Sequence, residues 1–277
     1  MKKENLDTDY SKEVTPNVEK QESTFPSEVI DLPSKGLVYP KDNLLSSGQI
    51  DLRYMTTKEE DILASTNLIK KGVVIDKLLE ALIVDKNINY KSLVLGDKDA
   101  IMYAARILGY GENYNTKITC QKCGEDDETT IDLSELKEKD IDYDILTPDN
   151  RYEFELPHSK AKIVFKLLTV DDDLQIEKEL KYREAFNKKT NKTKDVVQQD
   201  ISTRLKYLII EVNNKSTKGD INKFVDTMLS RDSIALREYY NKIAPGMDTD
   251  INFTCSKCGG STVVSIPLTV NFFWPNV

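Results

Sequence analysis

The sequence predicts an α+β fold in which helical segments and short β-hairpins surround two distant cysteine motifs. All four cysteines fall in two C-x-x-C motifs, Cys120–Cys123 and Cys255–Cys258, which are separated by much of the 277-residue chain. Residues of high β propensity precede and follow each motif. Apolar residues at helical spacing occupy much of the remainder, so we expect the motifs to lie on small hairpins in a largely helical chain.

Both motifs occupy the same local pattern. A strand (116–119 or 250–254) leads into the cysteine turn, and a return strand (129–133 or 261–268) follows it. The two copies therefore read as a pair of hairpins that would meet at their cysteine turns. The residues between them must then form a folded insertion.

The chemistry of the motifs predicts a metal site. The C-x-x-C spacing lets two thiolates bind one ion, and the glycine after each motif, Gly124 or Gly259, supplies the positive φ that such a turn needs. Four thiolates satisfy a tetrahedral Zn²⁺ completely and leave no open position for water or substrate. We therefore expect a structural zinc ribbon with four ligands: Cys120, Cys123, Cys255 and Cys258.

Other roles for the cysteines are weaker alternatives. No apolar signal-peptide core follows Met1, so a reducing compartment is expected, which argues against disulfides. Neither motif opens a helix after a strand, as a thioredoxin-like redox centre requires. Free thiols remain an alternative, and the spacing alone does not distinguish zinc from iron.

Composition and charge exclude several classes of function. Apolar residues make up 39% of the chain and charged residues 31%, which is typical of a soluble globular protein. No apolar run approaches the roughly 18 residues that a membrane span needs, so no membrane association is expected. The net charge of −8 and the acidic run 125–128 argue against nucleic-acid binding.

Motifs for catalysis are missing from the sequence. His158 is the single histidine, and no nucleophile motif accompanies it. Neither a phosphate-binding nor a dinucleotide-binding glycine motif occurs. We therefore expect no enzyme and no small-molecule substrate.

The pattern divides the chain into five expected segments. These are a flexible N-terminal arm (1–27), an extended anchor segment with a helical unit (28–114), the first knuckle hairpin (115–135), an inserted α+β region that is mainly helical (136–247), and the second knuckle hairpin with an aromatic tail (248–277). The arm is expected to be flexible because it is polar, charged and without hydrophobic period.

The anchor segment, residues 28–40, contains two prolines and a glycine turn, which favour an extended chain carrying hydrophobic side chains. Such a segment packs across its own domain or across a partner. We expect four of its residues to be partner-binding: Leu32, Pro33, Leu37 and Tyr39. A strand is then expected from 49 to 55 because apolar and polar residues alternate.

Start and stop signals place the helices. In the helical unit we expect a helix from Thr57, opened by a capping box, a second over 74–84, and a third over 98–108 capped by Asp97. In the inserted region, strands are expected over 151–156 and 161–168. Thr169 should cap a long polar helix that starts in 171–173. Further helices should span 196–212, 221–229 and 233–243, with Asp220 and Asp232 as caps.

Two charged stretches have a functional and a structural interpretation. The acidic triplet 171–173 could bind a divalent cation, but three carboxylates at a helix start match the helix dipole, which is the favoured interpretation. The basic stretch 181–194 could bind nucleic acid or an acidic partner. A solvated helix end is favoured, because the stretch has few interleaved aromatics.

The aromatic tail ends the chain with an apolar cluster. It contains the only tryptophan and two adjacent phenylalanines. Exposed, such a cluster would be an apolar patch, so it packs either on the chain's own core or into a neighbouring subunit. Packing on its own core is the favoured structural interpretation. The functional alternative is docking into a neighbour, because aromatic residues anchor interfaces, and its candidate partner-binding residues are Phe272, Phe273 and Trp274.

Several of these stretches resemble a known family. They are Leu32–Gly36, Met55–Leu63, Tyr110–Tyr114, Ile131–Ser134 and Phe272–Pro275. Together they resemble baseplate hub subunits of T4-like contractile-tailed bacteriophages, over residues 30–170 in particular. The second cysteine motif is not part of this resemblance, and its pairing with the first rests on chemistry.

The resemblance implies a non-enzymatic structural component of a phage-tail baseplate, in the hub or an adjacent wedge. Such a protein would be assembled in the host cytoplasm and reside in the virion. Its partners would be other phage baseplate and tail-hub proteins, contacted through the arm and the tail. Two alternatives stay open: an assembly chaperone absent from the mature virion, and a zinc-ribbon nucleic-acid-binding factor.

Overall fold

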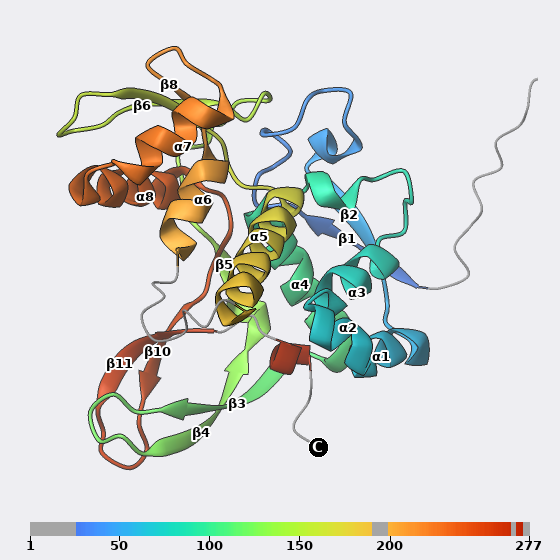
Figure 1. Cartoon of the computed structure of the whole chain (residues 1–277). Helices are drawn as coiled ribbons and strands as arrows, with labels where there is room; N and C mark the ends of the chain where they lie inside the picture. Colours follow the sequence, from blue (N-terminus) through green and yellow to red (C-terminus); the bar gives the residue numbers. More distant parts are fainter. Residues whose placement is uncertain (1–25, 190–198, 267–269, 274–277) are drawn as a thin grey trace, which may run out of the picture.

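The computed structural model describes residues 26–189, 199–266 and 270–273. Helices and small antiparallel sheets alternate along the chain (Figure 1), so the predicted α+β class is confirmed. The predicted N-terminal arm lies outside the described residues except for its last two positions.

The chain begins with a two-stranded sheet and a long turn. β1 (Ser27–Asp31) pairs antiparallel with β2 (Gln49–Arg53), and Ile30 lies opposite Ile50. The predicted extended segment is therefore a strand followed by turns that lead to a 3₁₀ turn, η1 (Leu44–Ser47). Gly36 has a φ of 75°, and a Cβ there would lie 2.5 Å from the carbonyl oxygen of Ser46. Only glycine fits at this position.

The helical unit follows as four helices: α1 (Thr57–Ala64), α2 (Thr66–Lys71), α3 (Val74–Leu82) and α4 (Leu95–Tyr110). The capping box that opens α1 joins Thr56 to Glu59, so the cap residue is one position earlier than the sequence predicts. α2 has no counterpart in the sequence analysis. It is a short helix that ends where Gly72 adopts the left-handed conformation.

Asp97 does not cap α4, contrary to the prediction. It lies inside the first turn, fully buried, and accepts hydrogen bonds from Ser34 N (2.9 Å), Ser34 Oγ (2.6 Å) and Tyr39 Oη (2.5 Å). Burial raises the pKa of Asp97, while the bonds from Ser34 and Tyr39 act in the opposite direction. The carboxylate thus fixes the turn after β1 onto the helix.

The two cysteine motifs lie on the hairpins that the sequence predicts. β3 (Asn113–Thr119) pairs with β4 (Asp126–Asp132), and β10 (Asp250–Thr254) pairs with β11 (Ser261–Ser265). β4 is followed by a 3₁₀ turn, η3 (Leu133–Glu135), and by β5 (Lys137–Glu138). β5 pairs with β9 (Met247–Asp248), which joins the bases of the hairpins.

The inserted region contains a three-stranded antiparallel sheet of β6 (Tyr152–Glu155), β7 (Lys162–Phe165) and β8 (Ile209–Val212). Its helices are α5 (Val170–Lys189), α6 (Asp200–Leu208), α7 (Lys218–Asp226) and α8 (Ser230–Ile243). The predicted helix 196–212 is wrong beyond residue 208. Its last residues form β8, which suits the β-branched side chains of Ile209, Ile210 and Val212.

The predicted caps of two helices are also wrong. Thr217 caps α7 by accepting a bond from Asp220 N. Asp232 lies buried in the first turn of α8, where it accepts bonds from the backbone nitrogens of His158 (2.9 Å) and Ser159 (3.0 Å). Like Asp97, it ties a distant loop to a helix.

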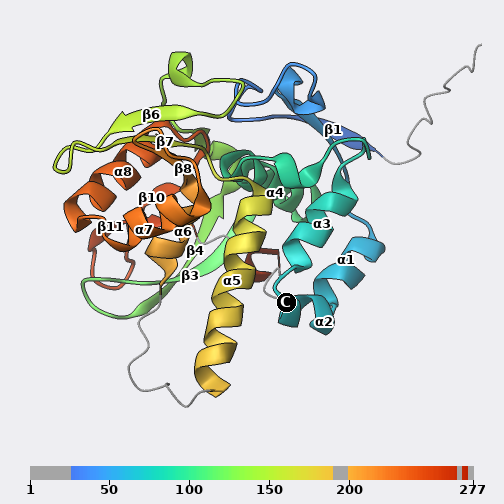
Figure 2. The same cartoon turned by 45° about the horizontal axis from the view of Figure 1, so that its top comes forward.

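One hydrophobic core joins the helical unit to the inserted region. Its members include Leu79, Ile101, Phe165, Leu236 and Phe272. α5 passes between α1–α3 on one side and α6–α8 on the other (Figure 2). A second, small cluster lies at the hairpin tips and is separate from the main core.

A pH-dependent contribution to stability comes from Glu59. This carboxylate is 2% exposed and is bound bidentately by Arg53 at 2.6 and 3.1 Å. Burial alone would raise the pKa of Glu59, but the hydrogen bonds from Arg53 and Thr56 lower it to about 2. A lowered pKa gives stability that is present above the unfolded value, 4.5, and is lost as the pH falls toward 2.

We therefore expect Glu59→Gln to have a smaller free energy of unfolding than the wild type at pH 7. As the pH falls, this free energy should decrease less in the variant than in the wild type, by up to about 3 kcal/mol. Urea midpoints at pH 7, 5, 4 and 3 would measure this. Glu60→Gln, an exposed neighbour on the same helix, is the control. Parallel pH curves for wild type and Glu59→Gln would contradict the assignment.

Candidate metal centre

The four cysteine sulfurs form one cluster. All four Sγ atoms lie within 4.8 Å of one another, with 3.7 Å between Cys120 and Cys258 and 3.9 Å between Cys123 and Cys255. Sulfurs placed tetrahedrally at about 2.3 Å from a metal ion would be about 3.8 Å apart. The cluster has this spacing, so the four cysteines could bind a metal ion.

The two cysteine turns have the same backbone structure. Gly124 N donates to Cys120 O, and Gly259 N donates to Cys255 O, both at 2.9 Å. The two glycines have φ values of 74° and 67°, the left-handed conformation that the sequence predicts for them. The repeated C-x-x-C-G sequence therefore adopts the same backbone conformation in both places.

The turn also favours a thiolate at Cys120. Lys122 N points at Cys120 Sγ at 3.4 Å. The backbone N–H groups of Cys123 and Lys122 lower the pKa of Cys120 to about 6. A thiolate is the form of cysteine that binds metal, so this arrangement prepares the site for a cation.

Each pair contributes one buried and one exposed cysteine. Cys120 and Cys255 are 1% exposed and pack with Phe253, whereas Cys123 and Cys258 lie at the surface. The sulfurs on the inner side are therefore shielded from water. None of the four has a histidine near it, so the donor set is sulfur alone.

Polar contacts reinforce the meeting of the two hairpin tips. Asp127 accepts bonds from Ser256 N (2.6 Å) and Ser256 Oγ (2.8 Å). These bonds lower the pKa of Asp127. Lys257 Nζ donates to Asp126 O at 2.6 Å and lies 3.7 Å from a carboxylate oxygen of Glu125. Sequence reasoning read this acidic run only as repelling phosphate and missed its partners on the other hairpin.

The acidic triplet and the basic stretch both have internal partners. Lys166 binds Asp172 at 2.7 Å, and Arg204 binds Asp173 at 3.1 Å. These cations support the helix-start interpretation over a divalent metal site. The four cysteines are the better candidate for metal binding, because they form the one candidate cluster within the residues that the structure describes.

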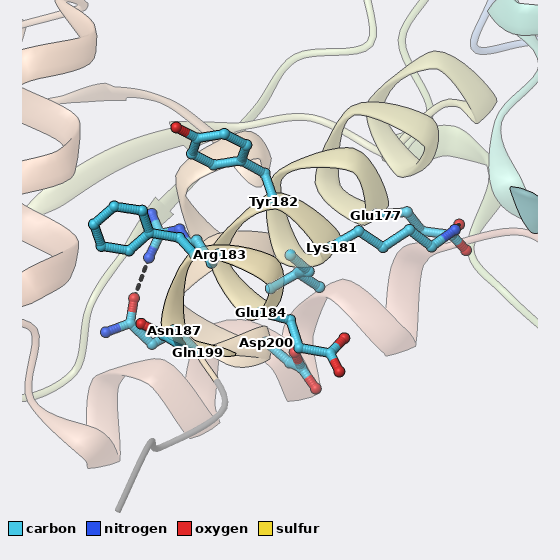
Figure 3. Close-up of a pocket in the computed structure, with 10 residues that line it drawn as sticks. Glu177, Lys181, Tyr182, Arg183, Glu184, Asn187, Gln199 and Asp200 are labelled. Carbon is cyan, nitrogen blue, oxygen red and sulfur yellow. Dashed lines mark hydrogen bonds and ion pairs between the residues drawn. The ribbon is translucent and has the colours of Figure 1, made fainter. Parts of the chain in front are cut away.

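On the outer half of α5, Lys181 pairs with Glu177 at 3.0 Å and Arg183 pairs with Glu179 at 2.5 Å. Arg183 also bonds to Gln199 across a hollow of about 600 Å³ (Figure 3). This half of the helix is thus a mixed-charge surface. Among the side chains that the structure describes here, cations alternate with carboxylates and do not form the continuous cationic face that nucleic-acid binding requires.

The predicted partner-binding residues lie mainly inside the chain. Leu32, Pro33 and Tyr39 are buried, and Leu37, on the same turn, is 40% exposed. Trp274 lies outside the described residues. Within the anchor segment, Leu37 is therefore the predicted residue whose side chain is available to a partner.

Phe272 and Phe273 are fully buried in the chain's own core. The Phe272 ring lies 5.3 Å from that of Tyr103 and 5.0 Å from that of Tyr114, and its carbonyl accepts a 3.1 Å bond from Arg106 Nε. The tail is thus attached to α4 by aromatic packing and by a buried guanidinium. A partner-binding role for the two phenylalanines stays a prediction.

Comparison with known proteins identifies the family. A family model described as T4 bacteriophage base plate protein matches residues 37–274, which include all four cysteines and the two hairpins. The chain belongs to this family, and the class of protein that the sequence resemblance predicts is confirmed. No curated protein and no solved structure matches the chain. Within the described ranges, no helix is both long and apolar enough to cross a membrane.

The packing of the tail predicts a large effect of Phe272→Ala. Truncating a fully buried phenylalanine costs about 3–5 kcal/mol, so the urea midpoint and the melting temperature should fall markedly. Leu37→Ala, at an exposed position, should change stability by less than about 1 kcal/mol. Equal stability of the two variants would show that the tail does not belong to the core.

Proposed function

We propose that this chain is a non-enzymatic structural component of a phage contractile-tail baseplate, in the hub or an adjacent wedge. Membership of the T4 base plate protein family, over most of the chain, is the observation that carries this proposal. The fold supports it, because loops and chain ends are tied to helices by buried polar groups such as Asp97 and Arg106. Such a frame can join neighbouring subunits without changing shape.

The cysteine cluster fits a structural zinc ribbon. Four sulfurs at tetrahedral spacing would fill the coordination sphere of Zn²⁺ and leave no position for a substrate. The ion would fasten two hairpins whose cysteines are more than 130 residues apart in the sequence. Its role would be to fix the hairpin tips, and the reducing host cytoplasm would keep the thiols available during assembly.

Neighbouring baseplate and tail-hub proteins would be contacted through the two ends of the chain. Leu37 is exposed on a turn whose base is held by Asp97, so it is presented on a rigid support. At the other end, burial of Phe273 fixes the point from which Trp274 and the last residues continue. The N-terminal arm, 1–27, would supply a further contact to a neighbouring subunit.

The first test is the composition of the virion. We expect mass spectrometry of purified particles to find the chain at a low, fixed ratio to other baseplate proteins. Tail proteins co-purifying from infected cells while virions lack the chain would instead identify an assembly chaperone. Lack of any association with tail proteins would overturn the proposal.

The second test concerns the metal. Elemental analysis should find about one zinc per chain in the wild type and less than about one-tenth of this in Cys120→Ser. Amide exchange in both hairpins should then rise by at least tenfold, because metal binding contributes on the order of 10 kcal/mol in small zinc domains. Lys117→Ser, at an exposed position of β3, is the control. Iron in place of zinc, or no metal, would contradict the zinc assignment.

A further inference from the structure

A groove separates the two hairpins. It has a volume of about 440 Å³ and is lined by β4 residues 129–132, β10 residues 250–254, and the turns at their bases. The sulfur cluster and the Ser256–Asp127 bonds close it at the tips. The pairing of β5 with β9 closes it at the base. β4 and β10 are thus the two walls of this groove, which we call the slot.

The walls of this slot are open strand edges. In the described part of the chain, each hairpin is a two-stranded sheet, so β4 and β10 each have one edge without a neighbouring strand. Cys255 N donates to Gly260 O and Ile266 N donates to Thr249 O, so the pairs at both ends of this ladder are hydrogen-bonded pairs. Hydrogen-bonded and non-hydrogen-bonded pairs alternate between them. Asn252 and its cross-strand neighbour Val263 therefore form a non-hydrogen-bonded pair. The backbone N–H and C=O groups of both residues therefore point out of the hairpin. Those of Asn252 lie on the edge of β10 that lines the groove.

The same alternation holds on the other wall. Cys120 N bonds to Glu125 O, and Leu133 N bonds to Glu112 O. Thr130 therefore lies in a non-hydrogen-bonded pair with Asn115, and its N–H and C=O point out of the hairpin along β4. Two rows of strand donors and acceptors thus line one groove.

A built-in turn keeps the walls from pairing with each other. Continuing the β5–β9 register beyond Lys137 would place Leu133 opposite Asn252. Leu133–Glu135 instead forms η3, capped by Asp132, whose carboxylate accepts bonds from Ser134 N and Oγ at 2.9 and 2.6 Å. The turn also buries Leu133 in the main core. The separation of β4 from β10 is therefore part of the fold.

The charge of the groove selects its occupant. Among its lining residues, one cation, Lys137, faces four carboxylates: Asp132, Glu135, Asp248 and Asp250. The chain's own residues 1–25 carry four lysines against six acidic residues, so they are a poor electrostatic match. An extended segment rich in lysine or arginine would complement both the edges and the charge.

We propose that the groove between β4 and β10 binds an extended, basic segment of another polypeptide by adding it as a strand between the two hairpins. This proposal rests on the proposed function, in which the chain is joined to neighbouring baseplate subunits. Main-chain hydrogen bonds to the open edges would supply affinity, and the carboxylates would favour cationic side chains. The metal at the tips would hold the slot at a fixed width.

The test uses a synthetic peptide of five residues, the length of the β10 wall, that alternates lysine with valine or threonine and is titrated into the full-length, metal-loaded protein. A peptide with glutamate in place of lysine controls for charge. Asn252→Pro removes an N–H from the groove edge of β10. Val263→Pro removes one from the outer edge of β11, on the opposite side of the hairpin at the same cross-strand pair. Neither change breaks the β10–β11 ladder, because both nitrogens point outward.

We expect the lysine peptide to bind and the glutamate peptide not to bind. Asn252→Pro should weaken binding by roughly tenfold or more, and Val263→Pro by less than about twofold. In the wild type, the peptide should slow amide exchange in residues 126–132 and 250–254 but not in 113–119. This second measurement stays informative if a proline variant fails to fold.

Absence of binding, equal weakening by both proline variants, or protection confined to the outer strands would overturn the proposal. Dimerisation of the free protein that Asn252→Pro abolishes would also overturn it, because the groove would then belong to a second copy. Virion composition reports separately on the proposed function. A virion-resident chain that does not bind the peptide would refute the groove assignment alone.

Discussion

The meeting of the two hairpin tips constrains the whole chain. Cys120 and Cys258 are brought to 3.7 Å although 138 positions separate them, so the chain after the first hairpin must return to the same point. The return is completed by the short pairing of β5 with β9, directly before the second hairpin. Everything between these places folds as an insertion whose two ends are fixed side by side. Only the hairpin tips form a cluster of their own, because Tyr114, Ile131 and Ile266, nearer the bases of the hairpins, belong to the main core.

The sequence was most informative where short-range chemistry decides the structure. The C-x-x-C-G pattern predicts both turns, and β-rich flanks predict both hairpins, because each depends on residues close together in the chain. The capping box at the start of α1 was displaced by one residue, since Thr56 and Thr57 are both suitable caps. The helix predicted over 196–212 continued too far, because β-branched residues at its end pair with β7.

Residues whose partners are distant in sequence were assigned wrongly or missed. Asp97 and Asp232 look like helix caps because aspartate is common at helix starts, yet their carboxylates bind backbone groups more than 60 positions away. The Ser256–Asp127 contact across the hairpins has no local signal. Burial of Phe272 follows from a pocket formed by Tyr103 and Tyr114, which could be recognised only after α4 and β3 were placed.

α4 holds both ends of the described chain. Asp97, in its first turn, binds the turn that follows β1, and Arg106, near its end, binds the carbonyl of Phe272. These two residues are nine positions apart, or about 14 Å along a helix. A pulling force applied between the N-terminal and C-terminal attachments would therefore travel along this short helical strut. The base of the first cysteine hairpin would share this load, because Tyr114 of β3 packs on the ring of Phe272.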